Sequence, residues 1–108
     1  MTEMTLDWSA VRDRYATEVS LAPLAGSSRL TAVLADDDTI LVRRKLWQLL
    51  LTRGDLDTAA EVLTRMPEPV TAVRFAERLR AHYTSTTECS RIPNVSAVVL
   101  TDLGLLSR

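Results

Sequence analysis

The sequence predicts an all-α fold, a compact bundle of about five to six short helices that forms a single helical domain over residues 1–108. Two observations support this prediction. Apolar residues recur at three- and four-residue intervals along most of the chain, as a buried helix stripe requires. The breaks between these stripes hold the Pro, Gly, Ser and Asp residues that begin and end helices. A chain of this length can form one hydrophobic core without disulfide or metal support.

Two helices are expected in the N-terminal part. The first begins at Asp7 or Thr5, because either side-chain oxygen can accept a hydrogen bond from the first helical turn. Its apolar stripe consists of Trp8, Val11, Tyr15 and Val19. The segment 22–28 contains a proline and a glycine and should end this helix. A short helix over residues 30–34 follows, capped by one of the preceding serines.

The most regular segment, residues 38–63, predicts a long helix, a break and a second helix. The long helix carries an apolar stripe made of Ile40, Leu41, Leu46, Trp47, Leu50 and Leu51. The acidic run 36–38 offers N-caps for it. Arg53 and Gly54 are typical of a helix end, where a cation and a flexible backbone are both favoured. The next helix begins at Asp55 or Asp57 and continues to Leu63.

Two further helices are expected towards the C-terminus. Pro69 suits the first turn of a helix that continues to Tyr83. The polar segment Thr84–Ser90 predicts an exposed loop. Asn94 can cap a last helix over Val95–Leu103, although the contiguous apolar residues 98–100 would also fit a buried strand. Both interpretations of this last segment stand at this stage.

Composition limits the classes of protein to consider. The chain is 46% hydrophobic and 25% charged, which is typical of a globular protein. No apolar stretch reaches the roughly 18 residues of a membrane span. Residues 1–7 lack the features of a secretory signal, and the single Cys89 cannot build a disulfide framework, so we expect a cytoplasmic protein. Twelve arginines against one lysine are typical of an actinobacterial or phage source with a GC-rich genome.

No pattern of catalytic residues is present. His82 lacks the second histidine or cysteine that a metal site needs, and the acidic run 36–38 lacks the spacing of a calcium loop. Cys89 has no nearby partner in sequence that would activate a thiolate. Trp8 and Trp47 fall on apolar stripes and are interpreted as core residues. The sequence therefore predicts a protein that is not an enzyme and holds neither metal nor cofactor.

Positive charge is concentrated in the middle of the chain. Residues 40–83 hold eight cations and five acidic residues, whereas residues 1–39 hold three cations and seven acidic residues. Affinity for DNA follows the number of phosphates neutralised locally, so a net charge of -1 does not exclude DNA binding. The predicted contacts come from the run 43–45, helped by three arginines further along: Arg43, Arg44, Lys45, Arg74, Arg78 and Arg80. A merely solvated helix face would explain the run 43–45 equally well.

The order of elements from Arg43 to Leu105 resembles the actinobacterial integration host factor family. Residues 43–45 match the basic helix of that family, and Gly54–Leu63 match its short second helix. The segment Ile92–Ser96, I-P-N-V-S, is similar to its L-P-G-V-G element. The resemblance implies an all-helical, non-enzymatic protein that binds duplex DNA and acts in the nucleoid or in phage integration.

The I-P-N-V-S segment departs from the family pattern. Asn94 and Ser96 stand where the family has the two glycines that approach a DNA phosphate, and they are the candidate phosphate contacts in this chain. Ala97 stands where the family has a lysine, and the basic C-terminal tail of the family is missing.

Two alternatives remain open from the sequence. The acidic N-terminal helix and the apolar stripes would also suit a protein-interaction adaptor, including a phage-encoded one, that docks on a host or regulatory protein. The end of the chain, Val99–Arg108, also resembles the end of the recognition helix in winged-helix regulators, although no wing strands can follow. Under either function the hydrophobic content is compatible with a homo-oligomer.

Overall fold

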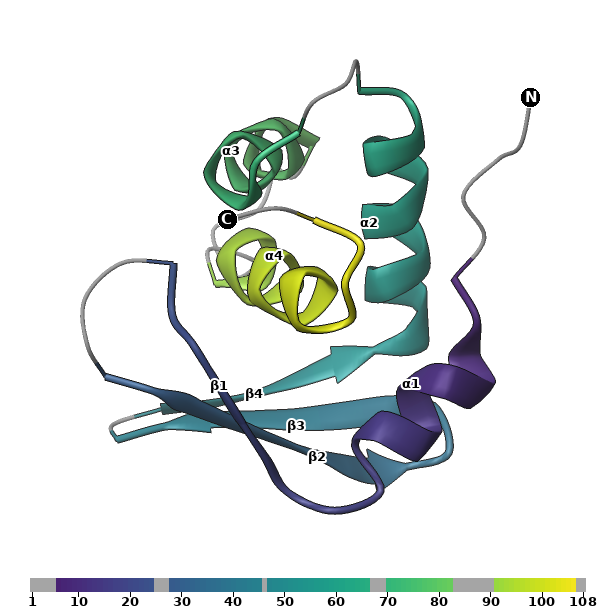
Figure 1. The fold of residues 1–108 in the computed structure, drawn as a ribbon, viewed down its shortest axis with the longest axis vertical. Coiled ribbons are helices and arrows are strands. Elements are labelled where there is room, and N and C mark those ends of the chain that lie inside the picture. Colours follow the sequence, from purple (N-terminus) through teal and green to yellow (C-terminus); the bar gives the residue numbers. More distant parts are fainter. Residues whose placement is uncertain (1–5, 25–27, 46, 67–69, 83–90, 107–108) are drawn as a thin grey trace.

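The computed structural model describes residues 6–24, 28–45, 47–66, 70–82 and 91–106 (Figure 1). The elements, in chain order, are α1 (Trp8–Arg14), β1 (Val19–Leu21), β2 (Leu30–Asp36), β3 (Thr39–Arg44), β4 (Trp47–Thr52), α2 (Arg53–Thr64), α3 (Ala72–His82) and α4 (Ile92–Asp102). The fold is therefore mixed α/β, and the prediction of an all-α bundle is wrong. No helix in the described ranges is both long enough and apolar enough to cross a membrane.

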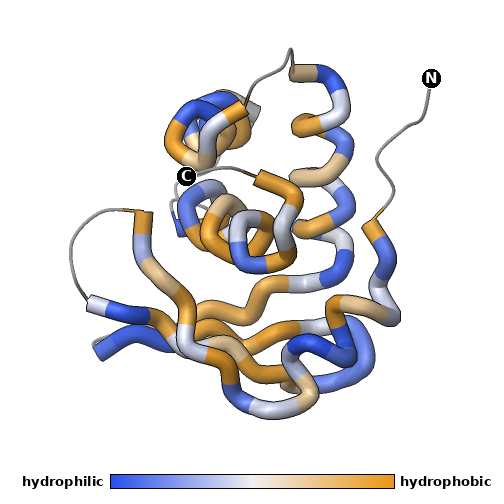
Figure 2. Tube along the Cα trace, viewed as in Figure 1, coloured by the Kyte–Doolittle hydropathy of each residue, from blue (hydrophilic) through white to orange (hydrophobic). Residues whose placement is uncertain are grey.

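The four strands form an antiparallel sheet in the order β1-β2-β3-β4, so each strand pairs with its neighbour in sequence. Figure 1 shows α4 nearest the sheet, α3 on the far side of α4, and α2 standing beside both. In the same view α1 lies near the end of the sheet where β2 turns into β3. Figure 2 shows hydrophobic residues gathered between the sheet and the helices.

The long helix predicted over residues 38–53 is instead the hairpin of β3 and β4. The sequence of β3 begins with Thr39 and Ile40, and β-branched residues favour strands because their side chains fit a pleated surface. Ile40 and Val42 are fully buried, whereas Leu41 between them points to the other side of the sheet. The burial therefore alternates with a period of two residues, which a helix cannot produce.

The short helix predicted over residues 30–34 is also wrong, because these residues belong to β2. Leu30 and Ala32 are buried, and the residue between them is only partly buried. The acidic run that follows is not a helix N-cap. It forms the turn between β2 and β3, in which the Asp36 carboxylate accepts a hydrogen bond from the backbone N–H of Asp38 at 2.9 Å.

The helices agree with the sequence-based expectation better than the strands do. Asp7 caps α1 as predicted, its carboxylate accepting from the backbone N–H of Ser9 at 3.0 Å, but α1 ends well before Val19. Helix α2 begins earlier than expected. Thr52 and Asp55 form a capping box, in which each side chain accepts from the other's backbone N–H. Arg53 and Gly54, which the sequence suggests as a helix end, are therefore the first residues of α2.

Helix α4 is the central element of the helical layer. Its residues Val95–Leu100 are buried without interruption, because the sheet, α2 and α3 all pack around it. This position explains the apolar run that also suggested a strand, and the structure shows a helix. The N-cap of α4 is Arg91 rather than Asn94, and Arg91 makes no side-chain capping bond.

A polar cluster at the edge of the core joins α1 to the end of α4. The hydroxyl of Tyr15, which is fully buried, donates to the Asp102 carboxylate at 2.8 Å. The Arg14 guanidinium donates to both oxygens of the same carboxylate, at 2.9 and 3.0 Å. The hydrogen bond from Arg14 lowers the pKa of Asp102, while burial raises the pKa of Tyr15. The cluster therefore holds an ionised carboxylate and a neutral phenol.

Candidate functional site

A cleft of about 310 Å³ lies where β3, β4 and the start of α4 meet. Its floor is apolar and includes Leu24, Leu30, Val95 and Val98. Three of these side chains are buried in the hydrophobic core, and Leu24 packs against it. The floor of the cleft is therefore continuous with the core and held in place by it.

The rim of the cleft is cationic. Arg44, at the end of β3, points to the helix-facing side of the sheet because it lies two residues after the buried Val42. Arg91, immediately before α4, contributes the second guanidinium. No acidic residue lines the cleft within the described part of the chain. The two positive charges are therefore not neutralised by a carboxylate in the cleft wall.

Trp47 lies between these two arginines. It pairs with Arg44 across the β3–β4 hairpin, and the guanidinium carbon of Arg91 lies 4.9 Å from the centroid of its ring. A guanidinium in this position is attracted to the negative face of the indole. Trp47 is only partly buried, so it forms part of the cleft wall as well as the margin of the core.

Asn94 brings a third arginine to the same rim. Its side-chain oxygen accepts a hydrogen bond from Arg80 of α3 at 2.8 Å. Asn94 also lines the cleft, in the first turn of α4. The positive end of the α4 dipole lies in this turn, which adds to the potential produced by the arginines. The rim therefore favours an anion.

The basic run 43–45 is divided by the hairpin. Arg43 points to the other side of the sheet, where its guanidinium pairs with the Glu18 carboxylate at 3.0 Å. Arg44 points into the cleft, and Lys45 lies at the turn. A shallow hollow of about 520 Å³, lined by residues 43–45 together with Trp47 and Gln48, adjoins the cleft. Of the three predicted contacts in this run, Arg44 thus reaches the cleft and Lys45 lies beside it.

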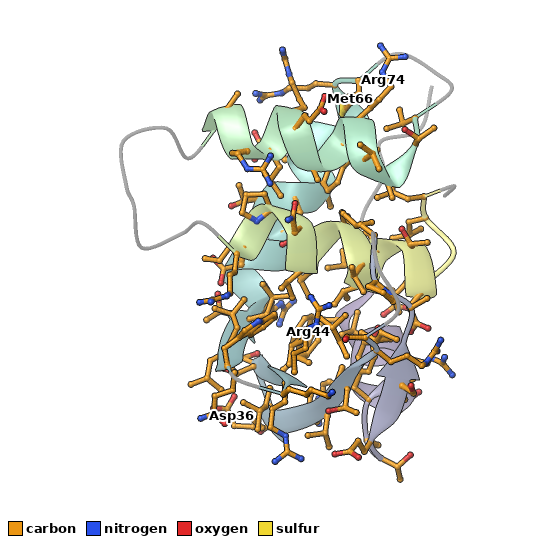
Figure 3. All side chains as sticks on the ribbon, turned by 90° about the vertical axis from the view of Figure 1, so that its left-hand side faces the viewer. Asp36, Arg44, Met66 and Arg74 are labelled. Atoms are coloured by element: carbon orange, nitrogen blue, oxygen red, sulfur yellow. The ribbon has the colours of Figure 1, made fainter. Side chains whose placement is uncertain are left out.

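Arg74 and Arg78 do not join this group. They line a separate hollow together with Arg65 and the acidic Glu77. Figure 3 shows Arg74 beside Met66 at the α3 end of the molecule, well separated from Arg44 at the level of the sheet. The six cations predicted to contact DNA therefore do not form one face: Arg44, Lys45 and Arg80 lie at or near the cleft, Arg74 and Arg78 line another hollow, and Arg43 pairs with Glu18 across the sheet.

The remaining predicted residues have different surroundings. Ser96 is fully buried, and its hydroxyl has no hydrogen-bond partner among the described residues. It therefore cannot reach a phosphate at the surface, whereas the exposed Asn94 can. No group of three or more potential ligands is placed to hold a metal ion in the part of the chain that is described. The His82 side chain and Cys89 lie outside the described residues.

Sequence reasoning misses two residues of the cleft, Arg91 and Trp47. Trp47 falls on an apolar stripe, which suggests a core residue rather than a site residue. The position of Arg91 could identify it as a site residue. A cation next to a helix N-terminus is electrostatically unfavourable, so its presence there suggests a role other than stabilising the helix. Its neighbours Ile92 and Pro93 mark that helix start in the sequence.

The resemblance to the actinobacterial integration host factor family implies an all-helical fold, which differs from the α/β fold of this chain. Residues 43–45 lie on a hairpin rather than on a basic helix. Comparisons with protein-family models, curated proteins and solved structures found no match to this chain.

Proposed function

We propose that this protein binds single-stranded nucleic acid without catalysing a reaction. Backbone phosphates would lie along Arg44, Arg91 and Arg80, and one base would enter the cleft beside Trp47. The observation that carries the proposal is a cleft lined by Arg44, Arg91 and Trp47 above an apolar floor, with the Arg91 guanidinium over the indole and without an acidic neighbour among the described residues of the cleft.

The arginines suit phosphate oxygens. A guanidinium is always charged near neutral pH and presents a planar fork of donors that matches two oxygens of a phosphate. Arg43 is less available than Arg44 because Glu18 neutralises it. Arg44 and Arg91 line the cleft, and Arg80 is bound to Asn94 beside it. If all three contact phosphates, the affinity should fall with salt by a log–log slope of about -2, at roughly 0.7 per contacted phosphate.

The cleft suits a base. Its volume of about 310 Å³ lies within the range of small-ligand sites, and its apolar floor and the indole of Trp47 would contact the flat face of a ring. Stacking on an aromatic residue contributes about 1–3 kcal/mol per base and is tolerant of sequence. Such a site favours a flexible strand over a duplex, because the bases of a duplex are stacked on one another and cannot enter.

The near-neutral net charge of the chain supports nucleic-acid binding at the cleft alone rather than over a wide surface of the protein. A duplex-binding face needs many cations on one side, whereas Arg74 and Arg78 lie away from the cleft. In the adaptor alternative, α1 would dock on another protein through its apolar stripe, but this stripe is not exposed. Trp8, Val11 and Tyr15 of that stripe are all buried in the core.

The test is fluorescence anisotropy with a short labelled single strand and the matching duplex over a salt series. The single strand should bind more tightly, with a salt slope of about -2. Trp47→Ala should weaken single-strand binding by roughly tenfold or more, because it removes the stacking surface. Trp47→Phe keeps an aromatic ring and should restore most of that binding. No binding at low salt, or equal binding of the duplex, would contradict the proposal.

A further inference from the structure

Arg44 lies in the cleft wall without a polar partner of its own. It is partly buried, whereas the other arginines in the described ranges are exposed. Its guanidinium makes no ion pair or hydrogen bond with another described residue. Withdrawing donors from water without giving them acceptors costs free energy. Arg44 therefore suits a ligand that brings hydrogen-bond acceptors into the cleft.

The polar side chains of the cleft wall are mainly hydrogen-bond donors. The guanidinium groups of Arg44 and Arg91 can only donate, and so can the indole N–H of Trp47. Among the described lining residues, Asn94 is the one whose side chain also carries an acceptor, because an amide has both an oxygen and a nitrogen. The fate of that amide oxygen therefore decides which base edge the cleft can pair with.

Arg80 fixes the orientation of the Asn94 amide. Its guanidinium donates to Asn94 Oδ1 at 2.8 Å. Because a guanidinium cannot accept a hydrogen bond, the amide oxygen must face Arg80 on α3, and the amide nitrogen remains for a ligand. A free asparagine pairs with adenine through both atoms, its oxygen accepting from the adenine amino group. The contact with Arg80 engages that oxygen and therefore disfavours adenine.

We propose that the cleft selects guanine over adenine, an inference that rests on the proposed function for the entry of a base. Guanine presents two adjacent acceptors, O6 and N7, which arginine reads bidentately, whereas adenine has an amino donor in place of O6. Arg44 would donate to O6 and N7 with one edge of its guanidinium and keep its other donors for a phosphate. The Asn94 nitrogen would add a donor to O6, with Arg80 as its positioning residue.

The test is fluorescence anisotropy with short labelled strands that carry a single base, all other positions being abasic, so that the strands differ in that base alone. The guanine strand should bind at least about fivefold more tightly than the adenine strand, the lower end of the discrimination by a bidentate contact. Hypoxanthine keeps O6 and N7 but lacks the amino group of guanine, and it should bind like guanine. 7-Deazaguanine lacks N7 and should lose most of the preference.

Three variants assign the selectivity to residues. Arg44→Lys keeps the charge but loses the planar fork, so the preference for guanine should disappear while the salt dependence remains. Arg80→Met removes the donor to Asn94, so the affinity for adenine should rise relative to guanine, whereas a merely structural role of Arg80 would lower both alike. Arg74→Lys is the matched control, because Arg74 lines the other hollow, and it should keep the full preference.

Equal affinity for the guanine and adenine strands would overturn this proposal and leave the proposed function intact. Retention of the preference in Arg44→Lys would also overturn it. If no strand binds, the proposed function fails, and equilibrium dialysis with GMP and AMP tests the selection of guanine by itself. Tighter binding of GMP than of AMP would support the selection and identify a free guanine nucleotide as the ligand. Equal binding of the two nucleotides, or none, would overturn it.

Discussion

At the scale of single residues, the clearest stabilising contact is the one between Asp102 and Tyr15. The phenol is fully buried and donates its proton to the carboxylate at 2.8 Å. Asp102→Ala would leave that hydroxyl without its acceptor, and an unpaired buried donor costs about 1–3 kcal/mol. Urea unfolding should show a loss of this size. The control is Asp13→Ala, an exposed carboxylate on α1, which should change the free energy of unfolding by less than about 0.5 kcal/mol.

The Asp102 carboxylate should also make the free energy of unfolding depend on pH. The hydrogen bond from Arg14 lowers the pKa of Asp102 in the folded protein below the ordinary value of 3.8. A lowered pKa gives stability that is present above the unfolded value and is lost as pH falls through the folded one. The wild type should therefore lose its stability advantage over Asp102→Asn below about pH 4, as urea midpoints at several pH values would show. A constant advantage down to the lowest pH would contradict this role.

At the scale of elements, the junction between β4 and α2 depends on one capping box. Thr52 ends the strand, and its hydroxyl accepts from the backbone N–H of Asp55 at 3.1 Å. Thr52→Ala should lower the free energy of unfolding by about 1 kcal/mol, measured in urea, because a helix donor loses its partner. Thr52→Ser keeps the hydroxyl and should be close to the wild type. A large loss for the serine variant would mean that the methyl group of Thr52 matters more than the cap.

The helices could be predicted from the sequence because their signals are local. Asp7 starts α1 through its own side chain, and the apolar spacing of α2, α3 and α4 fits one buried stripe or a fully buried helix. The strands could not be found in the same way. Leu49, Leu50 and Leu51 suit a helix as well as a strand, and the choice depends on pairing with β3. The capping box at Thr52 is the local signal that marks where a helix begins rather than ends.

At the scale of the whole molecule, the fold assembles the cleft from segments far apart in sequence. Arg44 could be proposed from sequence because it lies in a basic run, and Asn94 because it stands where the resembled family has a glycine that approaches a phosphate. The placement of Arg91 over Trp47 could not be predicted, because it is set by the packing of α4 on the sheet. The split between Arg44 and the pair Arg74 and Arg78 is likewise a property of the tertiary structure.

The central claim is that the cationic cleft, rather than total charge, binds the nucleic acid. The measurement is single-strand affinity at low salt for two variants of equal net charge, Arg44→Glu with Arg91→Glu and Arg74→Glu with Arg78→Glu. The cleft variant should bind at least a hundredfold more weakly than the wild type and lose most of the salt slope. The second variant should lose less than about fivefold, because its arginines line a different hollow. Equal losses in the two variants would contradict the claim.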